Sequence, residues 1–452
     1  MTTIRTSLSA AAMKASLLKL RKANAAFARR YPGDSPDRQP VHTVYGGAQL
    51  FQADAAQKLG DIALRTLREY APDGRALAEA VGIPEGIADA VHARVAGKLE
   101  KEPVEDFRID FEDGYGNRPD KEEDEEAART AEEVAKGMAA GTLPPFVGIR
   151  IKSLTGELHR RAVRTLDVFV STLVARTRGR LPGNFVVTVP KVTIPSHVST
   201  VATLATALEK ANRLRPGALR LEIMVETTQA VLDRRGRAGL RKLVAAGRGR
   251  VVAAHFGTYD YTASCNITAA HQQMSHPACD FAKHVLQVAL AGTGVWLSDG
   301  ATNVMPVAPH RRPPGGPDLG EEERRENRTA VHRAWRRHYD DVRHSLVHAY
   351  YQGWDLHPSQ LPTRYAAVYA FFLEGLDAAS RRLKSFTEKA AQATLLGDVF
   401  DDAATGQGLL NFFLRGLNCG AITPEEAAAT GLTLDEIRGR SFLRILEGRR
   451  AR

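Results

Sequence analysis

The sequence predicts an α/β protein built as a (β/α)8 TIM barrel, with a helical extension before it and a helical appendage after it. Two observations predict this fold. Short apolar, β-branched runs recur eight times with helical stretches between them, and most of these runs end near a charged residue. Alternating strands and helices imply parallel strands joined by crossovers, and eight such units close most naturally into a barrel. An open, doubly wound sheet is the alternative.

The eight predicted strands define where the barrel lies. They occupy residues 40–47, 106–114, 146–153, 184–192, 219–228, 251–260, 294–303 and 353–361. No GxGxxG or GxxxxGK[ST] pattern follows any of them, which argues against a dinucleotide-binding fold and a P-loop NTPase. We therefore expect a catalytic barrel over residues 40–361, an N-terminal helical extension over 1–39 and a C-terminal helical region over 362–452.

Three connecting segments have distinct compositions. The N-terminal extension contains a basic amphipathic helix with no apolar signal core. Pro119 and Asp120 open an acidic helix, whose charges indicate a solvated outer face. Residues 308–328 are rich in proline, glycine and charge and form a loop, either a lid or a surface excursion, before a long helix expected near Thr329.

The composition limits the classes of function. The chain has 452 residues, with 43% hydrophobic and 25% charged residues, as in an ordinary soluble globular protein. No apolar run of about 18 residues appears, so we expect a cytoplasmic protein with no membrane partner. The net charge of +10 favours anionic partners in general, including phosphorylated cofactors, and the basic stretches lack any nucleic-acid motif. Cys265, Cys279 and Cys419 form no CxxC pair, so a disulfide framework or thiolate zinc site is not predicted.

Polar residues gather at the predicted strand ends, where barrels carry their catalytic groups. They are Asp110, Glu112, Asp113, Arg150, Lys191, Glu226, Asp260, Asp299 and His357. Two carboxylates without cysteine ligands suit a hard cation such as Mg²⁺ or Mn²⁺, and Glu226 and Asp260 are the best-placed pair. The alternative for each acid alone is a bond to a neighbouring amide or arginine. A transition-metal site is a further alternative, but histidines 255, 271, 276 and 284 do not place three on one helical face.

A set of motifs in a fixed order resembles a known family. The stretches are "RIDFEDGYGNRPDKEEDEEAAR", "VGIRIKS", "VPKV", "IMVETTQAV", "HFGTYDYTA" and "GWDLHPSQL". Together they resemble the citrate lyase β-subunit-like (HpcH/HpaI aldolase) family of the phosphoenolpyruvate/pyruvate-binding barrel superfamily. The resemblance extends from roughly residue 40 to 415, and its strength lies in the ordered set because each motif alone is weak.

The resemblance implies a role for several residues. It implies that Glu226 and Asp260 bind Mg²⁺, with Arg150 stabilising an enolate oxygen. Glu112 and Asp113 would lie beneath the metal, and the remaining motif positions, Lys191, Gly257 and Thr258, would bind substrate or support the ligands. Asp401 matches an acid that relatives with CoA substrates supply from an adjacent subunit as general base, with Asp402 as its rival. A homo-oligomer is therefore expected.

The chemistry of these groups favours an aldol-type reaction. A divalent ion chelated by a 2-oxo acid withdraws electrons, and a nearby arginine lowers the cost of an enolate. Lys191 suggests a Schiff base, but the resemblance gives it no such role. Relatives with CoA substrates carry a Pro-Gly-x-Arg turn after the first strand, where this chain has Gly46 and Gly47 without an arginine. We therefore expect a free hydroxy or 2-oxo acid substrate, with a CoA-thioester lyase and a non-catalytic binding barrel as alternatives.

Overall fold

Eight parallel strands form the barrel in the computed structural model. The structure describes residues 7–33, 35, 37–312, 315–388, 394–396, 399–401, 403–439, 441, 442, 444, 445 and 448. The strands are β1 (His42–Gly47), β2 (Asp106–Asp110), β3 (Phe146–Arg150), β4 (Phe185–Val189), β5 (Arg220–Val225), β6 (Val251–Phe256), β7 (Trp296–Ser298) and β8 (Gly353–Asp355). Strands β1 to β7 each lie beside their sequence neighbours, and β1 also pairs with β8. The predicted fold class is confirmed.

The last gap of the barrel, between β7 and β8, is closed by residues just beyond β7. The backbone N–H of Trp354 donates to the carbonyl oxygen of Gly300 at 3.0 Å, and the N–H of Asp299 donates to that of Gln352 at 2.8 Å. Because these bonds continue the ladder, the open-sheet alternative is wrong.

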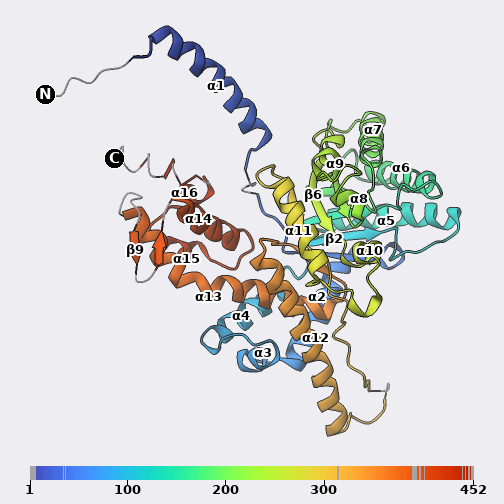
Figure 1. Ribbon diagram of the computed structural model, residues 1–452. Helices are drawn as coiled ribbons and strands as arrows, with labels where there is room; N and C mark the ends of the chain where they lie inside the picture. The colour runs from blue at the N-terminus through green and yellow to red at the C-terminus, as the bar shows by residue number, and fades with distance from the viewer. Residues whose placement is uncertain are drawn as a thin grey trace.

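Helices surround the barrel and extend it at both ends of the chain (Figure 1). They are α1 (Ala10–Arg30), α2 (Ala55–Tyr70), α3 (Gly74–Val81), α4 (Glu85–Lys101), α5 (Asp120–Ala140), α6 (His159–Arg176), α7 (Pro195–Ala211), α8 (Thr228–Val231), α9 (Leu240–Ala246), α10 (Thr258–Ser264), α11 (Pro277–Leu290), α12 (Glu321–Val347), α13 (Leu361–Glu388), α14 (Ala403–Asn418), α15 (Pro424–Ala428) and α16 (Leu434–Arg438), with the short helices η1 (Ala48–Leu50), η2 (Ala269–His271) and η3 (Pro358–Gln360). No helix of the described residues is long and apolar enough to cross a membrane.

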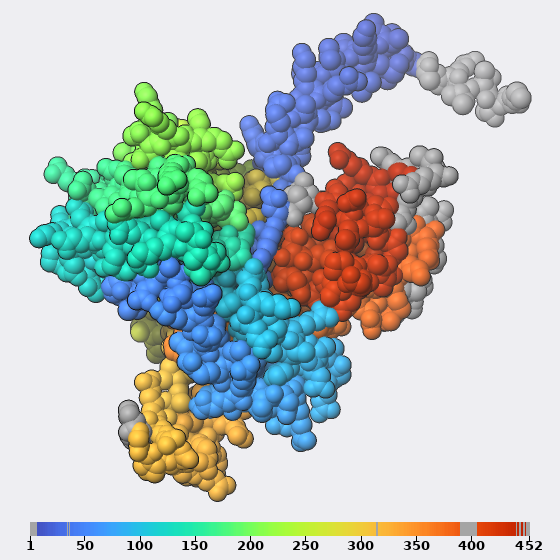
Figure 2. Space-filling model, turned by 180° about the vertical axis from the view of Figure 1, so that it is seen from behind, coloured from blue at the N-terminus to red at the C-terminus, as the bar shows by residue number. Residues whose placement is uncertain are grey.

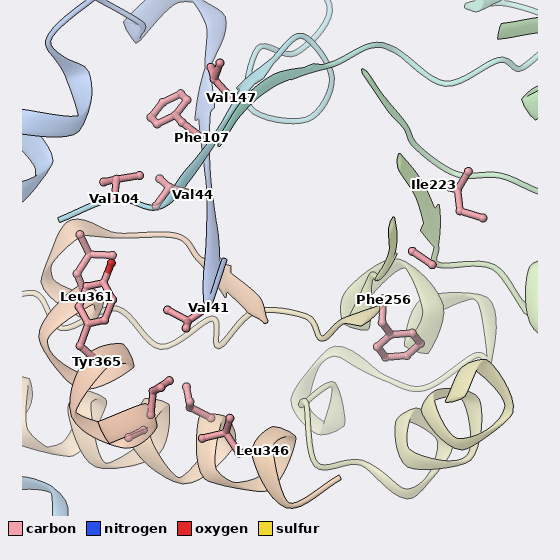
Figure 3. Packing of buried hydrophobic residues seen from close by; sticks show 14 of the residues in the cluster. Val41, Val44, Val104, Phe107, Val147, Ile223, Phe256, Leu346, Leu361 and Tyr365 are labelled. Atoms are coloured by element: carbon pink, nitrogen blue, oxygen red, sulfur yellow. The ribbon is translucent and has the colours of Figure 1, made fainter. Parts of the chain in front are cut away.

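The hydrophobic core lies between the strands and the surrounding helices. Alternate residues of each strand point outward, and in Figure 3 Val44, Phe107 and Val147 of the strands belong to this core. Leu346 of α12 and Tyr365 of α13 belong to the same core. Since side chains alternate along a strand, the opposite set faces the barrel interior.

The barrel interior is polar rather than apolar at mid-height. Arg108 donates to Thr188 Oγ1 at 3.1 Å and to Glu222 at 3.0 Å, and it also pairs with Asp106. His255 Nε2 lies 2.7 Å from Glu222 Oε2. These side chains are buried and form a charged layer directly below the strand ends. Buried charge on this scale is stable only when it is paired and hydrogen-bonded, as it is here.

Two helical regions differ from the expectation or add to it. The helix predicted near Thr329 begins at Glu321, where Glu323 accepts a hydrogen bond from the Gly320 N–H at 2.7 Å. Acids in the first turn favour a helix start, so the charge that suggested a loop belongs to α12. Between β1 and β2 the chain forms α2, α3 and α4, more than a single crossover needs.

The C-terminal appendage continues directly from the barrel. The first ten residues of α13 are buried, and the same helix then leads to the hairpin of β9 (Thr394–Leu396) and β10 (Val399–Asp401) and to α14–α16. Figures 1 and 2 show this appendage beside the barrel, with α1 projecting away from both. Asp401 is the last residue of β10, and Asp402 lies outside the described residues.

Candidate active site

Arg150 and Asp110 form the base of the site at neighbouring strand ends. They are register partners on β3 and β2, so their side chains point to the same side of the sheet. Arg150 Nε donates to Asp110 Oδ1 at 2.7 Å, and its Nη2 donates to Oδ2 at 2.5 Å. This two-pronged contact fixes the guanidinium plane and leaves Nη1 near the Glu112 carboxylate, 3.2 Å from Oε2.

Two aromatic rings support the same guanidinium. Its carbon lies 4.8 Å from the ring centre of Tyr45 and 5.8 Å from that of Trp354, and the two rings are 4.4 Å apart. The Trp354 Nε1–H donates to His255 Nδ1 at 3.2 Å, which connects this platform to the charged layer below. Burial works against the charge of Arg150, but Asp110 and Glu112 hold its pKa well above the ordinary value. Arg150 is therefore a fixed, permanently charged donor.

Lys191 reaches into the centre of the site from the end of β4. Its backbone has φ +48°, in the left-handed region that a lysine rarely adopts. In this conformation its N–H donates to Glu226 Oε1 at 2.6 Å. Its Nζ lies 2.5 Å from Glu112 Oε1 and 3.5 Å from Asp260 Oδ2. The strained backbone thus directs both ends of one residue at the acids of the site.

Asp113 completes the acids around the lysine. Its two oxygens each lie 3.1 Å from Lys191 Nζ. Despite partial burial, Arg150 and Lys191 lower the pKa of Asp113, whereas burial and the neighbouring Asp113 raise that of Glu112. Burial also opposes the charge of Lys191, but Glu112, Glu226 and Asp260 hold its pKa above the ordinary value. Lys191 is therefore an ammonium ion, and the Schiff-base alternative is not supported.

Glu226 lies just past β5 and packs tightly on the end of β6. A Cβ atom on Gly257 would meet Glu226 Oε2 at 2.4 Å, so only glycine admits the carboxylate in this position. Burial, and then repulsion by Asp260 and Glu112, raises the pKa of Glu226 to about 8. Next to Gly257, Thr258 is buried with its Oγ1 against Gly300, where an added Cβ would lie 2.1 Å away.

These residues fit a hard divalent cation. Glu226 and Asp260 supply oxygen donors from adjacent strand ends. Burial, and then Asp260 and Glu112, raise the pKa of Glu226, and a cation beside it would favour its charged form. Within the described part of the chain, no three His, Cys, Asp or Glu residues group closely enough to bind a metal by themselves. Glu226 and Asp260 are the residues that could hold such an ion, with its other positions left to water and substrate oxygens.

Two strand-end residues predicted to join the site do not. Asp299 points outward from β7, where it pairs with Lys283 at 3.0 Å and accepts from Ser345 at 2.7 Å. Trp296 and Ser298 of β7 point into the barrel, so Asp299, the next residue, points towards the helices. His357 instead caps η3, where its Nδ1 accepts from the Ser359 N–H at 3.1 Å.

Sequence analysis missed three residues that shape the site. Tyr45 and Trp354 lie within predicted strands. The alternation of side chains along these strands indicated that both rings point into the barrel, where Arg150 also points. Lys152 is buried two residues beyond Arg150, in the same phase. Its Nζ donates to the carbonyl oxygens of Phe111 at 2.6 Å and Gly116 at 2.9 Å, the two ends of the loop that carries Glu112 and Asp113.

The fold and the site together define a (β/α)8 barrel with a cluster of acids around Arg150 and Lys191 at the carboxyl ends of its strands. The chain belongs to the family described as a domain of unknown function (DUF6986), whose model matches residues 20–445. No curated protein matches its sequence significantly.

Solved structures show what the fold is similar to. A citrate lyase from Burkholderia xenovorans LB400 is 17% identical, with a TM-score of 0.56 over 88% of this chain and 98% of that one. A malate synthase from Haloferax volcanii, solved as a lead(II) complex, is 13% identical, with a TM-score of 0.45 over 92% and 98%. An HpcH/HpaI aldolase/citrate lyase family protein from Burkholderia cenocepacia J2315 is 13% identical, with a TM-score of 0.37 over 80% and 99%. The first likeness confirms the expected resemblance for the fold alone, and the other two scores are too low to carry an argument.

Proposed function

We propose that this protein is a carbon–carbon lyase or aldolase that uses Mg²⁺, or Mn²⁺, to cleave or form an aldol bond in a 2-oxo or hydroxy acid. The observation that carries the proposal is the convergence of Arg150 with Glu226 and Asp260, around Lys191, at one barrel mouth. A fixed arginine beside a pair of cation-binding carboxylates is the minimum that enolate chemistry requires.

The chain's own residues perform most of the work. A divalent cation held by Glu226 and Asp260 would withdraw electrons from the carboxylate and ketone oxygens of a 2-oxo acid. Arg150 donates from Nη1 to the developing negative oxygen of the substrate, because Asp110 occupies its Nε and Nη2, and it shares this Nη1 with the Glu112 carboxylate 3.2 Å away. Tyr45 and Trp354 hold the guanidinium from one side, so that it does not reorient as charge develops.

Lys191 acts as a binding cation in this proposal. As an ammonium ion among three acids it cannot accept a proton from the substrate hydroxyl, and it is too fully protonated to form an imine. It screens the acids from one another and presents a positive charge to an anionic substrate. The general base is a separate group, and Asp401, contributed by a neighbouring subunit, remains a prediction.

The substrate is a free acid in this proposal rather than a CoA thioester. The turn after β1 is filled closely, since a Cβ on Gly47 would meet the Gly114 carbonyl oxygen at 2.3 Å and a Cβ on Gly46 would meet Phe107 at 2.6 Å. This turn therefore has no arginine for a CoA phosphate and packs against the acidic loop instead. The CoA-thioester lyase stays as the alternative that the experiment separates.

Calorimetric titration tests the proposal. Mg²⁺ is titrated first, and pyruvate, oxaloacetate, glyoxylate and acetyl-CoA follow in turn, on the wild type and on Glu226→Gln. We expect a free 2-oxo acid to bind only with Mg²⁺ present, and this binding to vanish in the variant. Glu157→Gln is the matched control, since it removes the same charge from an exposed position and should bind as the wild type does.

Each other outcome contradicts part of the proposal. Binding of acetyl-CoA in preference to the free acids would assign the CoA-thioester alternative. A folded wild type that binds neither metal nor oxo acid would rule out the lyase and leave a non-catalytic barrel.

A further inference from the structure

Helix α1 packs against no other helix or strand among the described residues of its own chain. None of its 21 residues is buried, and Figures 1 and 2 show it projecting away from the barrel and the appendage. Its C-terminal end is anchored where the Tyr31 hydroxyl accepts from Arg241 at 2.7 Å and the tyrosine ring lies 5.4 Å from the same guanidinium. Helices in proteins gain most of their stability from packing an apolar face, and α1 packs no such face within the described part of its own chain.

The apolar residues of α1 follow a coiled-coil repeat. Met13, Leu17, Leu20, Asn24 and Phe27 are spaced by four, three, four and three residues, which places them in one stripe. The four apolar members are 42%, 58%, 53% and 64% exposed, in chain order. Leu18, which is 50% exposed, falls outside the stripe. The stripe alternates the two core positions of a heptad, with Leu17 and Asn24 at the first position and Leu20 and Phe27 at the second.

The charges of α1 are arranged to permit self-pairing. The helix has six basic residues and no acidic one, which at first suggests that two copies would repel each other. Repulsion between the two helices depends mainly on the e and g positions of the heptad, which flank the stripe and face each other across a two-stranded coiled coil. In a parallel pair, Arg21 of one helix faces Ser16 of the other, and Ala28 faces Ala23. No cation therefore meets a cation across the seam.

We propose that α1 pairs with α1 of a second copy of this chain as a short, parallel, two-stranded coiled coil. Asn24 specifies this arrangement, because an asparagine at the first core position faces its own copy only in a parallel, in-register pair, where the two amides bond each other. On an anionic membrane the same amide would enter the apolar side without a partner. An acidic helix from another protein would leave the small residues at the flanking positions unexplained.

Disulfide trapping tests the parallel register on the full-length protein. Leu17→Cys places a thiol at the seam opposite its own copy, whereas Leu18→Cys places an equally exposed thiol outside it. We expect Leu17→Cys to give a covalent dimer on mild oxidation, at least tenfold faster than Leu18→Cys. The wild type sets the background from Cys265, Cys279 and Cys419. Equal rates for the two variants would overturn the proposal.

Sedimentation at increasing salt distinguishes self-pairing of α1 from its binding to an anionic membrane or to an acidic helix of another protein. Salt screens the repulsion between two basic helices, so dimerisation through α1 strengthens as salt rises, whereas binding to an anionic surface or an acidic helix weakens. We expect the double substitution Leu17→Asp with Leu20→Asp to weaken the dimer at least tenfold and Leu18→Asp to leave it within twofold. Because α1 buries nothing, the melting temperature of the barrel should stay unchanged in both.

Two results would refute the pairing. The first is a dimer that the double substitution leaves intact. The second is a monomer at all salt concentrations that binds phosphatidylserine vesicles through Leu17 and Leu20, which would assign α1 to a lipid surface.

Discussion

Two charge clusters of this protein differ in burial and in how completely their acids are paired, one partly exposed at the barrel mouth and one buried between strands and helices. The mouth cluster joins Glu112, Asp113, Glu226 and Asp260 to Arg150 and Lys191 at the strand ends. The strand–helix cluster joins Asp355 of β8 to His42 of β1, His338 of α12 and Arg364 of α13. Asp355 Oδ2 lies 2.7 Å from His42 Nδ1, Oδ1 lies 3.0 Å from His338 Nε2, and Arg364 reaches both oxygens. One carboxylate thus has three donors.

The difference appears in the pKa values of the acids. Although Asp355 is buried, Arg364 and the two histidines hold its pKa well below the ordinary value. In the mouth cluster, burial and repulsion between acids raise the pKa of Glu226 to about 8. The acid of the strand–helix cluster is therefore fully paired by the fold, whereas the four acids of the mouth cluster share two cations, Arg150 and Lys191. An acid with a raised pKa beside other acids is more typical of a functional site than of a structural ion pair.

Removing the acid of the strand–helix cluster should give the largest loss of stability. Asp355→Asn keeps the shape but leaves Arg364 buried without its countercharge, so we expect the free energy of unfolding to fall by about 3–5 kcal/mol. Urea unfolding followed by circular dichroism measures it. Asp340→Asn, at an exposed acid of α12, is the control and should change the value by less than about 0.5 kcal/mol. A loss below about 1 kcal/mol for Asp355→Asn would remove the contrast between the clusters.

Lys152 supports the loop that carries two acids of the mouth cluster, Glu112 and Asp113. Lys152→Met removes the ammonium that holds both ends of the Glu112 loop and that also lies 3.1 Å from the buried Glu123 carboxylate, with an expected cost of about 3 kcal/mol. We also expect affinity for the 2-oxo acid, measured by calorimetry, to fall at least tenfold as the acids lose their positions. Lys152→Arg should recover part of this affinity.

The control for this variant is Lys136→Met, which changes an exposed lysine of α5. Stability and affinity should both remain at wild-type values there. If Lys152→Met loses stability but binds as tightly as the wild type, the residue only supports the fold, and the loop positions itself.

The strands were predictable because their signals are local. An apolar, β-branched run that ends in charge can be recognised residue by residue, and all eight predicted strands are present. The convergence of Arg150, Lys191, Glu226 and Asp260 was also predictable, because parallel strands bring their carboxyl ends to one mouth. The prediction that Asp299 joins the site was wrong because side chains alternate along a strand. A shift of one residue turns a side chain from the barrel interior towards the surrounding helices.

The contacts within the site could not be predicted from the sequence. The pair of Arg150 with Asp110 depends on the register between β3 and β2, and the aromatic platform depends on barrel closure that brings β8 beside β1. Lys191 needs a left-handed backbone to reach Glu226, and no residue type at that position signals it. The register between strands and the local backbone strain arise only in the assembled barrel, so the pattern of apolar and charged residues in the sequence does not predict them.

Acid should weaken the strand–helix cluster in a defined window. The folded pKa of Asp355 lies below its ordinary value of 3.8, so its contribution is complete above that value and declines as the pH falls through it. Asp355→Asn has no such group, so its deficit relative to the wild type should shrink between pH 4.5 and 3.0, by up to about 1.4 kcal/mol per pH unit. Urea unfolding of both proteins at four pH values checks this. A constant deficit would show that Asp355 carries no proton-linked stability.

Neutralising an acid of the mouth cluster should change the free energy of unfolding in the opposite direction to Asp355→Asn, and by the smallest amount of the substitutions compared. Glu226→Gln removes one of the acids that repel each other and keeps an oxygen for the Lys191 N–H, so we expect the free energy of unfolding to stay constant or rise by up to about 1 kcal/mol. The same substitution should abolish binding of the metal and the oxo acid. Gly257→Ala displaces the Glu226 carboxylate by crowding it, and it should lose binding while also losing stability. If Glu226→Gln instead destabilised the protein as much as Asp355→Asn, the acids of the mouth would be structural.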